Sequence, residues 1–248
     1  MIDLSKFSIV LLSAGIGKRF GPMGVKKPKC LLQINNKTLI ELLIDNLKKR
    51  NAKKVSIIVG FKSKMLIKFL KNIKGIKINF IKINGYKKNG HSYSWFLYRS
   101  HWLKEKKPMM LFHTDIYFDP TYIDNILRSK KPNIIGVKSF RNHHFKKNSL
   151  VVKTNKENKI KSINFYNKIK RPQGEVIGIN KFTKTTTENI FNFMQDFFNK
   201  KNKSLSWEAL INIYIQKTKD SLFILKNQNY YWKNINTVDD YLTAKSIK

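Results

Sequence analysis

The sequence has only one cysteine, Cys30, and no long apolar run. One cysteine cannot form an intramolecular disulfide, so we expect a fold without disulfides in a reducing compartment, the cytoplasm. The apolar run Phe7–Ala14 is short and is followed at once by Gly15-Ile16-Gly17-Lys18-Arg19, which favours a buried first strand over a signal peptide. No other run approaches the roughly 20 residues that span a bilayer. We therefore expect a soluble protein without a membrane partner.

Acidic residues and arginine are also scarce in this strongly basic chain. The 15 acidic residues leave a formal charge of +35, yet few of the 50 basic residues are arginine. Such a charge first suggests a nucleic-acid partner. Base readers and phosphate clamps usually rely on arginine forks, however, and the lysines are scattered along the whole chain. We therefore predict a solvated basic surface that attracts a small anionic substrate, and keep a nucleic-acid-binding protein as the alternative from another class.

The first 140 residues or so alternate between apolar runs and helical patterns. Runs rich in Ile and Val predict buried strands at Phe7–Leu12, Val55–Val59, Ile76–Ile81, Met109–His113 and Asn133–Lys138. Apolar stripes at helical spacing predict helices at Leu39–Leu47 after the cap residue Thr38, Met65–Leu70, Tyr93–Leu103 and Thr121–Leu127. This alternation implies an α/β fold with a mainly parallel central sheet and helices on both faces.

The later part of the chain has a different pattern. Strands predicted at Ser149–Lys153, Lys159–Phe165 and Glu175–Ile179 leave no room for crossover helices, which indicates a small antiparallel element. Further elements are predicted at Thr185–Phe198 (helix), Ser206–Gln216 (helix), Leu222–Leu225 (strand) and from Val238 onward (helix). No repeat or linker divides the chain, so we expect a single domain over 1–248, with a core in 1–140 and the antiparallel element and C-terminal helices in 141–248.

A glycine-rich loop, Gly15-Ile16-Gly17-Lys18-Arg19-Phe20-Gly21, follows the first predicted strand. Its glycines can expose backbone N–H groups to phosphates, and Lys18 and Arg19 add positive charge. A Walker A loop is excluded, because Arg19 follows Gly17-Lys18 in place of Ser or Thr. A dinucleotide-binding loop is excluded as well, because the spacing is GxGxxxG and no acidic residue ends the second strand at Val59-Gly60.

A Pro-Lys segment, Lys27-Pro28-Lys29-Cys30-Leu31-Leu32, comes about ten residues after this loop. Together the two segments resemble the signature of the nucleotidyltransferases that activate sugar phosphates, phosphocholine and aminoethylphosphonate: Leu-(Ser/Ala)-Ala-Gly-x-Gly-x-Arg, then Pro-Lys-x-Leu. Other segments resemble later motifs of the family, in the same order: His113–Phe118, Glu175–Ile179, Trp207–Leu210 and Trp232–Asp240. The resemblance implies a Rossmann-like, GT-A-like nucleotidyltransferase fold over nearly the whole chain, with the nucleotide-binding core in 1–140 and the acceptor side in 141–248.

The resemblance also implies an activity. We expect a Mg²⁺-dependent enzyme that transfers a nucleoside monophosphate from an NTP, CTP being the expected one, to a small phosphorylated or phosphonylated acceptor, with release of pyrophosphate. Such a cytidylyltransferase would serve surface polysaccharide or phospholipid precursor synthesis. A sugar-1-phosphate uridylyl- or guanylyltransferase stays open as an alternative, because asparagine at position 236 occurs in some sugar-phosphate members and Gly90–Ser94 differs from the family's common patterns. A homodimer is also left open.

The resemblance assigns roles to particular residues. Lys29 is expected to draw the α-phosphate and the acceptor together, while Arg19 and Lys18 grip the β- and γ-phosphates. Asp115, at the carboxyl end of a strand, and Asn236 are the expected Mg²⁺ ligands, although a plain turn residue is an equal interpretation of Asn236. The expected nucleotide-binding residues are Leu12, Ser13, Ala14, Gly15, Gly17, Lys18, Arg19, Gly90 and Ser92. The expected acceptor-binding residues are Glu175, Glu208, Trp207, Trp232 and His91, with core packing the alternative for the tryptophans and a surface position for the glutamates.

Overall fold

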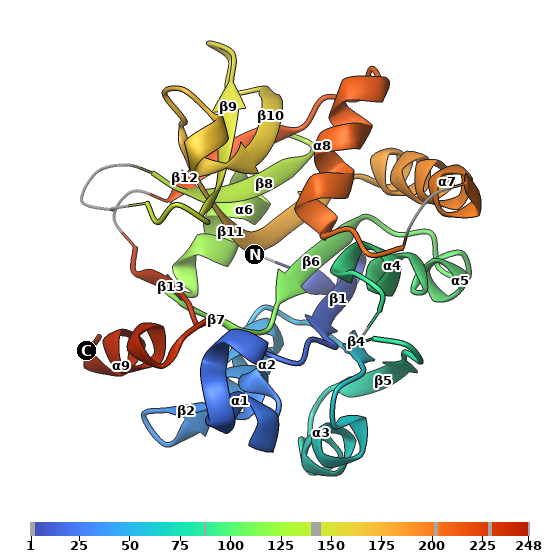
Figure 1. The fold of residues 1–248 in the computed structure, drawn as a ribbon. Coiled ribbons are helices and arrows are strands. Elements are labelled where there is room, and N and C mark those ends of the chain that lie inside the picture. Colours follow the sequence, from blue (N-terminus) through green and yellow to red (C-terminus); the bar gives the residue numbers. More distant parts are fainter. Residues whose placement is uncertain (1–2, 87, 140–144, 201–202, 228–229, 248) are drawn as a thin grey trace.

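The central feature of the computed structural model is one mixed sheet, in the part of the chain that it describes: residues 3–86, 88–139, 145–200, 203–227 and 230–247 (Figure 1). The strands of this sheet are β1 (Ser8–Ser13), β4 (Lys54–Val59), β5 (Lys77–Lys82), β6 (Met109–His113), β8 (Ile134–Lys138), β9 (Leu150–Thr154), β10 (Ile160–Phe165), β11 (Gly174–Phe182) and β12 (Phe223–Asn227). They lie in the order β10-β9-β11-β6-β1-β4-β5, with β8 beside β11 and β12 beside β8. The predicted α/β fold class is confirmed.

The first half of the sheet is parallel. Strand β1 pairs with β6 on one side and β4 on the other, and β4 pairs with β5. Strands β1, β4 and β6 are buried as the sequence predicted, and every residue of β1 except Leu12 is buried. The strand predicted at Ile76–Ile81 exists as β5, but the prediction that it is buried is wrong: only Ile81 is buried, because β5 lies at the edge of the sheet. Because parallel strands all end at the same edge, the chain segments that follow β1, β4 and β6 meet there.

The second half of the sheet is mostly antiparallel. Strand β11 runs antiparallel to β6, β8 and β9, and β9 and β10 form an antiparallel pair. The predicted antiparallel strands therefore exist. The long strand β11 pairs directly with β6 and joins them to the parallel half. One continuous sheet results.

Helices cover both faces of the sheet, as predicted. On one face lie α2 (Leu39–Lys48), α3 (Ser63–Leu70) and α6 (Thr121–Arg128), and on the other lie α4 (His91–Phe96), α5 (Arg99–Trp102), α7 (Lys184–Lys200) and α8 (Trp207–Lys217). Thr38 caps α2 in a capping box with Glu41, an arrangement worth about 1 kcal/mol of helix stability. The single helix predicted at Tyr93–Leu103 is wrong, because the chain forms two short helices there.

A smaller group of elements lies beside the ends of the parallel strands. It comprises α1 (Gly21–Lys26), β2 (Gln33–Ile34), β3 (Lys37–Thr38), β7 (Ile116–Phe118), β13 (Trp232–Asn234) and α9 (Val238–Ser246). Short 3₁₀ turns occur at Leu4–Lys6, Lys18–Phe20, Lys29–Leu31 and Tyr166–Lys168. Strand β13 pairs antiparallel with β7, which directly follows Asp115. This pairing brings the C-terminal segment next to the end of β6 (Figure 1).

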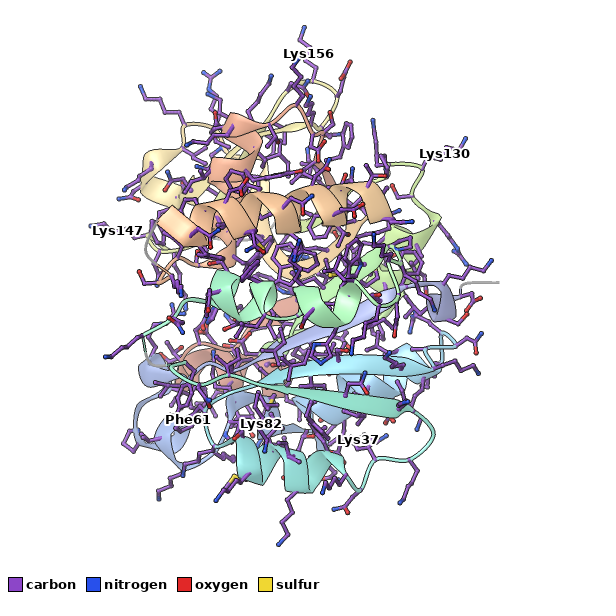
Figure 2. All side chains as sticks on the ribbon, turned by 90° about the vertical axis from the view of Figure 1, so that its right-hand side faces the viewer. Lys37, Phe61, Lys82, Lys130, Lys147 and Lys156 are labelled. Atoms are coloured by element: carbon purple, nitrogen blue, oxygen red, sulfur yellow. The ribbon has the colours of Figure 1, made fainter. Side chains whose placement is uncertain are left out.

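The basic residues are spread over the surface. Figure 2 labels five exposed lysines whose side chains extend from different sides of the molecule: Lys37, Lys82, Lys130, Lys147 and Lys156. This spread agrees with the predicted solvated basic surface. Among the residues that the structure describes, every helix is too short or too polar to span a bilayer.

Candidate active site

Two adjoining hollows open at the carboxyl ends of β1 and β6. The first is lined by Leu12, Ser13, Ala14, Gly15, Pro28, Lys29, Cys30, Ile58, His91, Ser94, His113, Thr114 and Asp115. The second, of about 290 Å³, is lined by Ala14, Gly15, Ile16, Gly17, Tyr86, Asn89, Gly90, His91, Ser94, Ser204 and Ser206. Both hollows are lined by Ala14, Gly15, His91 and Ser94, so the two form one continuous site.

The glycine-rich loop lies directly against Lys29. Gly17 has a φ of +67°, a left-handed conformation that favours glycine. A Cβ at this position would also lie only 2.9 Å from Cγ of Lys29. Gly17 therefore permits both the turn of the loop and the close approach of the lysine side chain.

Lys29 joins three segments that are distant in sequence. Its Nζ donates to Oδ2 of Asp115, to Oδ1 of Asn236 (3.1 Å) and to the carbonyl oxygen of Ile235 (3.1 Å). Burial raises the pKa of Asp115, but the charge of Lys29 and its hydrogen bond, together with His113, outweigh burial and lower the pKa to about 2. Asp115 is therefore an ionised carboxylate at neutral pH.

Arg19 reaches the same cluster from the loop. Its Nη2 donates to Oδ1 of Asn236 at 2.9 Å, so Asn236 accepts from both Arg19 and Lys29. The backbone of Lys18 belongs to the turn Lys18–Phe20, but its side chain lies outside the described part of the structure. The fold thus brings together the glycine-rich loop, Lys29, Asp115 and Asn236, as the resemblance implied. The roles of these residues stay predictions.

The oxygens around Lys29 suit a small hard cation. An ammonium group already contacts the carboxylate of Asp115, the amide oxygen of Asn236 and one backbone carbonyl. Carboxylate and amide oxygens are the ligand types that Mg²⁺ prefers. Within the described residues no group of three or more His, Cys, Asp or Glu side chains could hold a metal, so phosphate and water oxygens would have to complete the coordination of Mg²⁺ here.

Gly90 and Ser92 differ in their relation to the site. Gly90 lines the second hollow, but its N–H donates to the carbonyl of Lys203 at 2.8 Å. Ser92 is fully buried, and its Oγ donates to the carbonyl of Leu205 at 2.8 Å. It lines neither hollow. The expected role of Ser92 in nucleotide binding stays a prediction.

The expected acceptor residues do not form one group. Trp207 is fully buried in the core on the α8 face, with its ring 5.7 Å from that of His113. Trp232 is buried in the core on the opposite face, where Nε1 donates to the carbonyl of Ile177 at 3.1 Å. Neither tryptophan lines either of the two hollows. The core interpretation fits their positions.

Neither of the two glutamates lines a hollow. Glu208 is 8% exposed in the first turn of α8 and close enough to His113 to raise the pKa of that imidazole, although burial has the larger effect and lowers it. Glu175 lies on β11 opposite Lys138 and lines neither hollow. His91, by contrast, lines both.

Several lining residues were not identified from the sequence. Ser94 lies one helical turn after His91, so helical spacing from His91 could have indicated it. Tyr86, Asn89, Ser204 and Ser206 had no comparable signal, because tertiary packing alone brings the segment between α7 and α8 against the start of α4.

Comparison with known proteins gives the class of this protein. The sequence model of the family described as Nucleotidyl transferase matches residues 8–247. The chain belongs to this family, whose members generally use a divalent metal ion.

More specific likenesses are to cytidylyltransferases. Over 131 residues, 52% of this chain and 51% of the relative, the chain is 26% identical to CTP:phosphoglutamine cytidylyltransferase of Campylobacter jejuni. Over 71 residues, 29% of this chain and 31% of the relative, it is 39% identical to choline-phosphate cytidylyltransferase of Streptococcus pneumoniae. The aligned stretches thus span about half and about a third of these two curated relatives.

Solved structures share the whole fold. CTP:phosphocholine cytidylyltransferase from S. pneumoniae superposes with a TM-score of 0.80 at 20% identity, covering 98% of this chain and 99% of that one. The inositol-1-phosphate CTP transferase from T. maritima gives a TM-score of 0.80 at 17% identity, covering 97% and 96%. At these identities the likeness establishes the fold alone.

Proposed function

We propose that the protein is a cytoplasmic, Mg²⁺-dependent cytidylyltransferase. It would transfer CMP from CTP to a small phosphorylated or phosphonylated acceptor and release pyrophosphate. The observation that carries this proposal is the convergence of Lys29, Asp115 and Asn236 beside the glycine-rich loop. The proposed location follows from the use of a nucleoside triphosphate as substrate.

The chemistry is an in-line displacement. An acceptor oxygen attacks the α-phosphorus of CTP, the bond to the pyrophosphate oxygen breaks, and negative charge builds on the α-phosphate and leaving-group oxygens. Lys29 would neutralise charge at the α-phosphate and Arg19 at the leaving pyrophosphate. Asp115 and Asn236 would hold Mg²⁺, which supplies further charge neutralisation. No protein nucleophile is needed.

The choice of CTP rests on the relatives. Both curated relatives and both similar structures named above are described as CTP-using enzymes. A uridylyl- or guanylyltransferase would bind a different base in the same site, so nucleotide preference separates the two hypotheses.

The acceptor is proposed to be phosphocholine-, aminoethylphosphonate- or phosphoglutamine-like. Glu208 supports an acceptor that carries a positive charge, because it is a buried carboxylate beside His113, which lines the first hollow. A buried carboxylate gains most from a cationic partner. A sugar phosphate would gain only a hydrogen bond from it.

The test is a pyrophosphate-release assay with each of the four NTPs, Mg²⁺ and a panel of acceptors: phosphocholine, aminoethylphosphonate, phosphoglutamine and glucose 1-phosphate. We expect release with CTP and one of the first three acceptors. Lys29→Ala should lose this activity, whereas Lys68→Ala, an exposed lysine on α3, should retain it. Silence with every pair would overturn the proposal, and release with UTP or GTP and glucose 1-phosphate would favour the alternative.

A further inference from the structure

Asp240 is a buried carboxylate that lies behind the site. It is the third residue of α9 and only 5% exposed. Buried carboxylates are rare in proteins unless they are paired and hydrogen-bonded. The family resemblance gave this residue no role, and it lines neither hollow.

One oxygen of Asp240 holds the backbone at Asn236. Oδ2 accepts from the backbone N–H of Asn236 at 3.2 Å and from that of Thr237 at 3.0 Å. In return, the N–H of Asp240 donates to Oγ1 of Thr237 at 3.2 Å, which completes a capping box. The turn that carries Asn236 is therefore attached to the first turn of α9.

The other oxygen of Asp240 is neutralised by two lysines. Oδ1 accepts from Nζ of Lys146 at 2.9 Å and lies 3.2 Å from Nζ of Lys233. Two positive charges next to one carboxylate leave little net negative field at Asn236. The contribution of Asp240 to the site is therefore geometric.

The function proposed for Asn236 depends on how its side chain is placed. Its side chain lies on an irregular turn between β13 and α9, and its Oδ1 is directed at Lys29 and Arg19. A neutral amide binds a divalent cation more weakly than a carboxylate, so its contribution depends strongly on correct placement.

We propose that Asp240 is a positioning residue that holds Asn236 in the orientation required for metal binding and catalysis. This inference rests on the proposed function. It states that outer contacts tune a ligand of the metal, as is common for metal sites. The competing explanation is that Asp240 only stabilises the start of α9.

The chain provides a matched control for that explanation. Thr237→Ala removes the acceptor of the Asp240 N–H but leaves the contact between Asp240 and the Asn236 backbone. Asp240→Ala removes that contact as well. Each should lower the melting temperature by about 2–4 °C, the cost of a lost cap in a chain of this size.

The experiment measures kcat, KM for CTP and the Mg²⁺ concentration for half-maximal rate, together with Mn²⁺ binding by EPR without substrates. We expect Asp240→Ala to lower kcat about 10-fold or more, to raise the Mg²⁺ requirement and to weaken Mn²⁺ binding severalfold. Thr237→Ala should stay within about 2-fold of wild type in all of these. Asp240→Asn keeps an oxygen acceptor for the backbone N–H groups of Asn236 and Thr237, so its kcat and Mn²⁺ affinity should lie close to those of wild type. This variant replaces Asp240→Ala in the comparison if Asp240→Ala does not fold.

A double-mutant cycle completes the test. In an Asn236→Ala background, Asp240→Ala should reduce kcat and Mn²⁺ affinity by less than about 2-fold, because the positioned side chain is already absent. Equal losses in Thr237→Ala and Asp240→Ala, or an undiminished effect in the Asn236→Ala background, would overturn the inference. If the wild type shows no transfer with any substrate pair, the proposed function fails, while the Mn²⁺ measurements still decide the positioning role.

Discussion

Nζ of Lys29 donates a hydrogen bond to the carboxylate of Asp115, although 86 residues separate the two in sequence. Lys29 follows the glycine-rich loop after β1, and Asp115 follows β6, the neighbour of β1 in the sheet. Pairing of these two parallel strands is therefore what brings the ammonium and the carboxylate together. The side chains of both are largely shielded from solvent, 13% and 24% exposed, which strengthens their interaction.

Replacing Lys29 should affect catalysis more than binding. Lys29→Ala removes the cation expected at the α-phosphate, and we expect kcat to fall by about 10²–10³-fold, the usual effect of losing one charge-stabilising group. Pyrophosphate release at saturating CTP measures this. Lys68→Ala on α3 is the control for loss of a lysine elsewhere. A change confined to KM would contradict the assigned role.

Replacing Asn236 by aspartate should strengthen metal binding. Asn236→Asp adds a second carboxylate beside Asp115, and hard divalent cations bind more tightly as the ligands gain charge. We expect the Mg²⁺ concentration for half-maximal rate to fall severalfold, as measured by a Mg²⁺ titration of pyrophosphate release. Asn72→Asp, at an exposed position after α3, controls for the change in net charge. An unchanged Mg²⁺ requirement would argue that Asn236 is a turn residue and not a ligand.

Replacing Gly90 by alanine should destabilise the protein. A Cβ there would lie 1.8 Å from the carbonyl oxygen of Leu205, so Gly90→Ala must displace the segment before α8. We expect a loss of about 1–3 kcal/mol in the free energy of unfolding, typical of overpacking, in a urea titration. Gly15→Ala is the matched control, because its Cβ would meet only His91 Nε2 at an ordinary 3.6 Å. Equal stability of both variants would show that the 203–206 segment is not fixed against α4.

The sequence predicted those residues of the site that stand beside a recognisable strand end or turn. Lys29, Asp115 and the glycine-rich loop each stand at the end of a strand or turn with its own sequence signal, and the topology of a parallel sheet then requires them to meet. Ser204 and Ser206 carry no such signal. They line the site only because the carbonyls of Lys203 and Leu205 accept hydrogen bonds from the start of α4.

Aromatic residues show a second limit of sequence interpretation. Trp207 and Trp232 stand in segments that resemble acceptor-side motifs, yet each is buried in the core, Trp207 on one face of the sheet and Trp232 on the other. A tryptophan that contacts a substrate and one that packs in the core can stand in the same local sequence pattern. Only the packing of α8 and β13 decides between them.

Cys30 should behave as an inert, buried thiol. It is 2% exposed, and its Sγ lies 3.1 Å from Oγ of Ser13. Burial raises the pKa of the Cys30 thiol to about 12, and the thiolate is the form that reacts with iodoacetamide. We expect almost no alkylation of the folded protein at pH 8 and rapid alkylation in urea, where the pKa returns to about 8.5. Since this is the only cysteine of the chain, mass spectrometry gives an unambiguous readout.

The same shift predicts a dependence of stability on pH. The pKa of Cys30 is higher in the folded state, so its contribution is fully present below about pH 8.5, where both states hold the proton. It is lost as the pH rises toward about 12, because the unfolded chain ionises first. Lysines also titrate in this range, so the quantity to measure is the difference between wild type and Cys30→Ala in urea titrations from pH 7 to 10. The free energy of unfolding of wild type relative to Cys30→Ala should decrease above about pH 9. A difference between the two proteins that stays constant with pH would contradict the burial of this thiol. Fast alkylation of the folded protein at pH 8 without urea would contradict it as well.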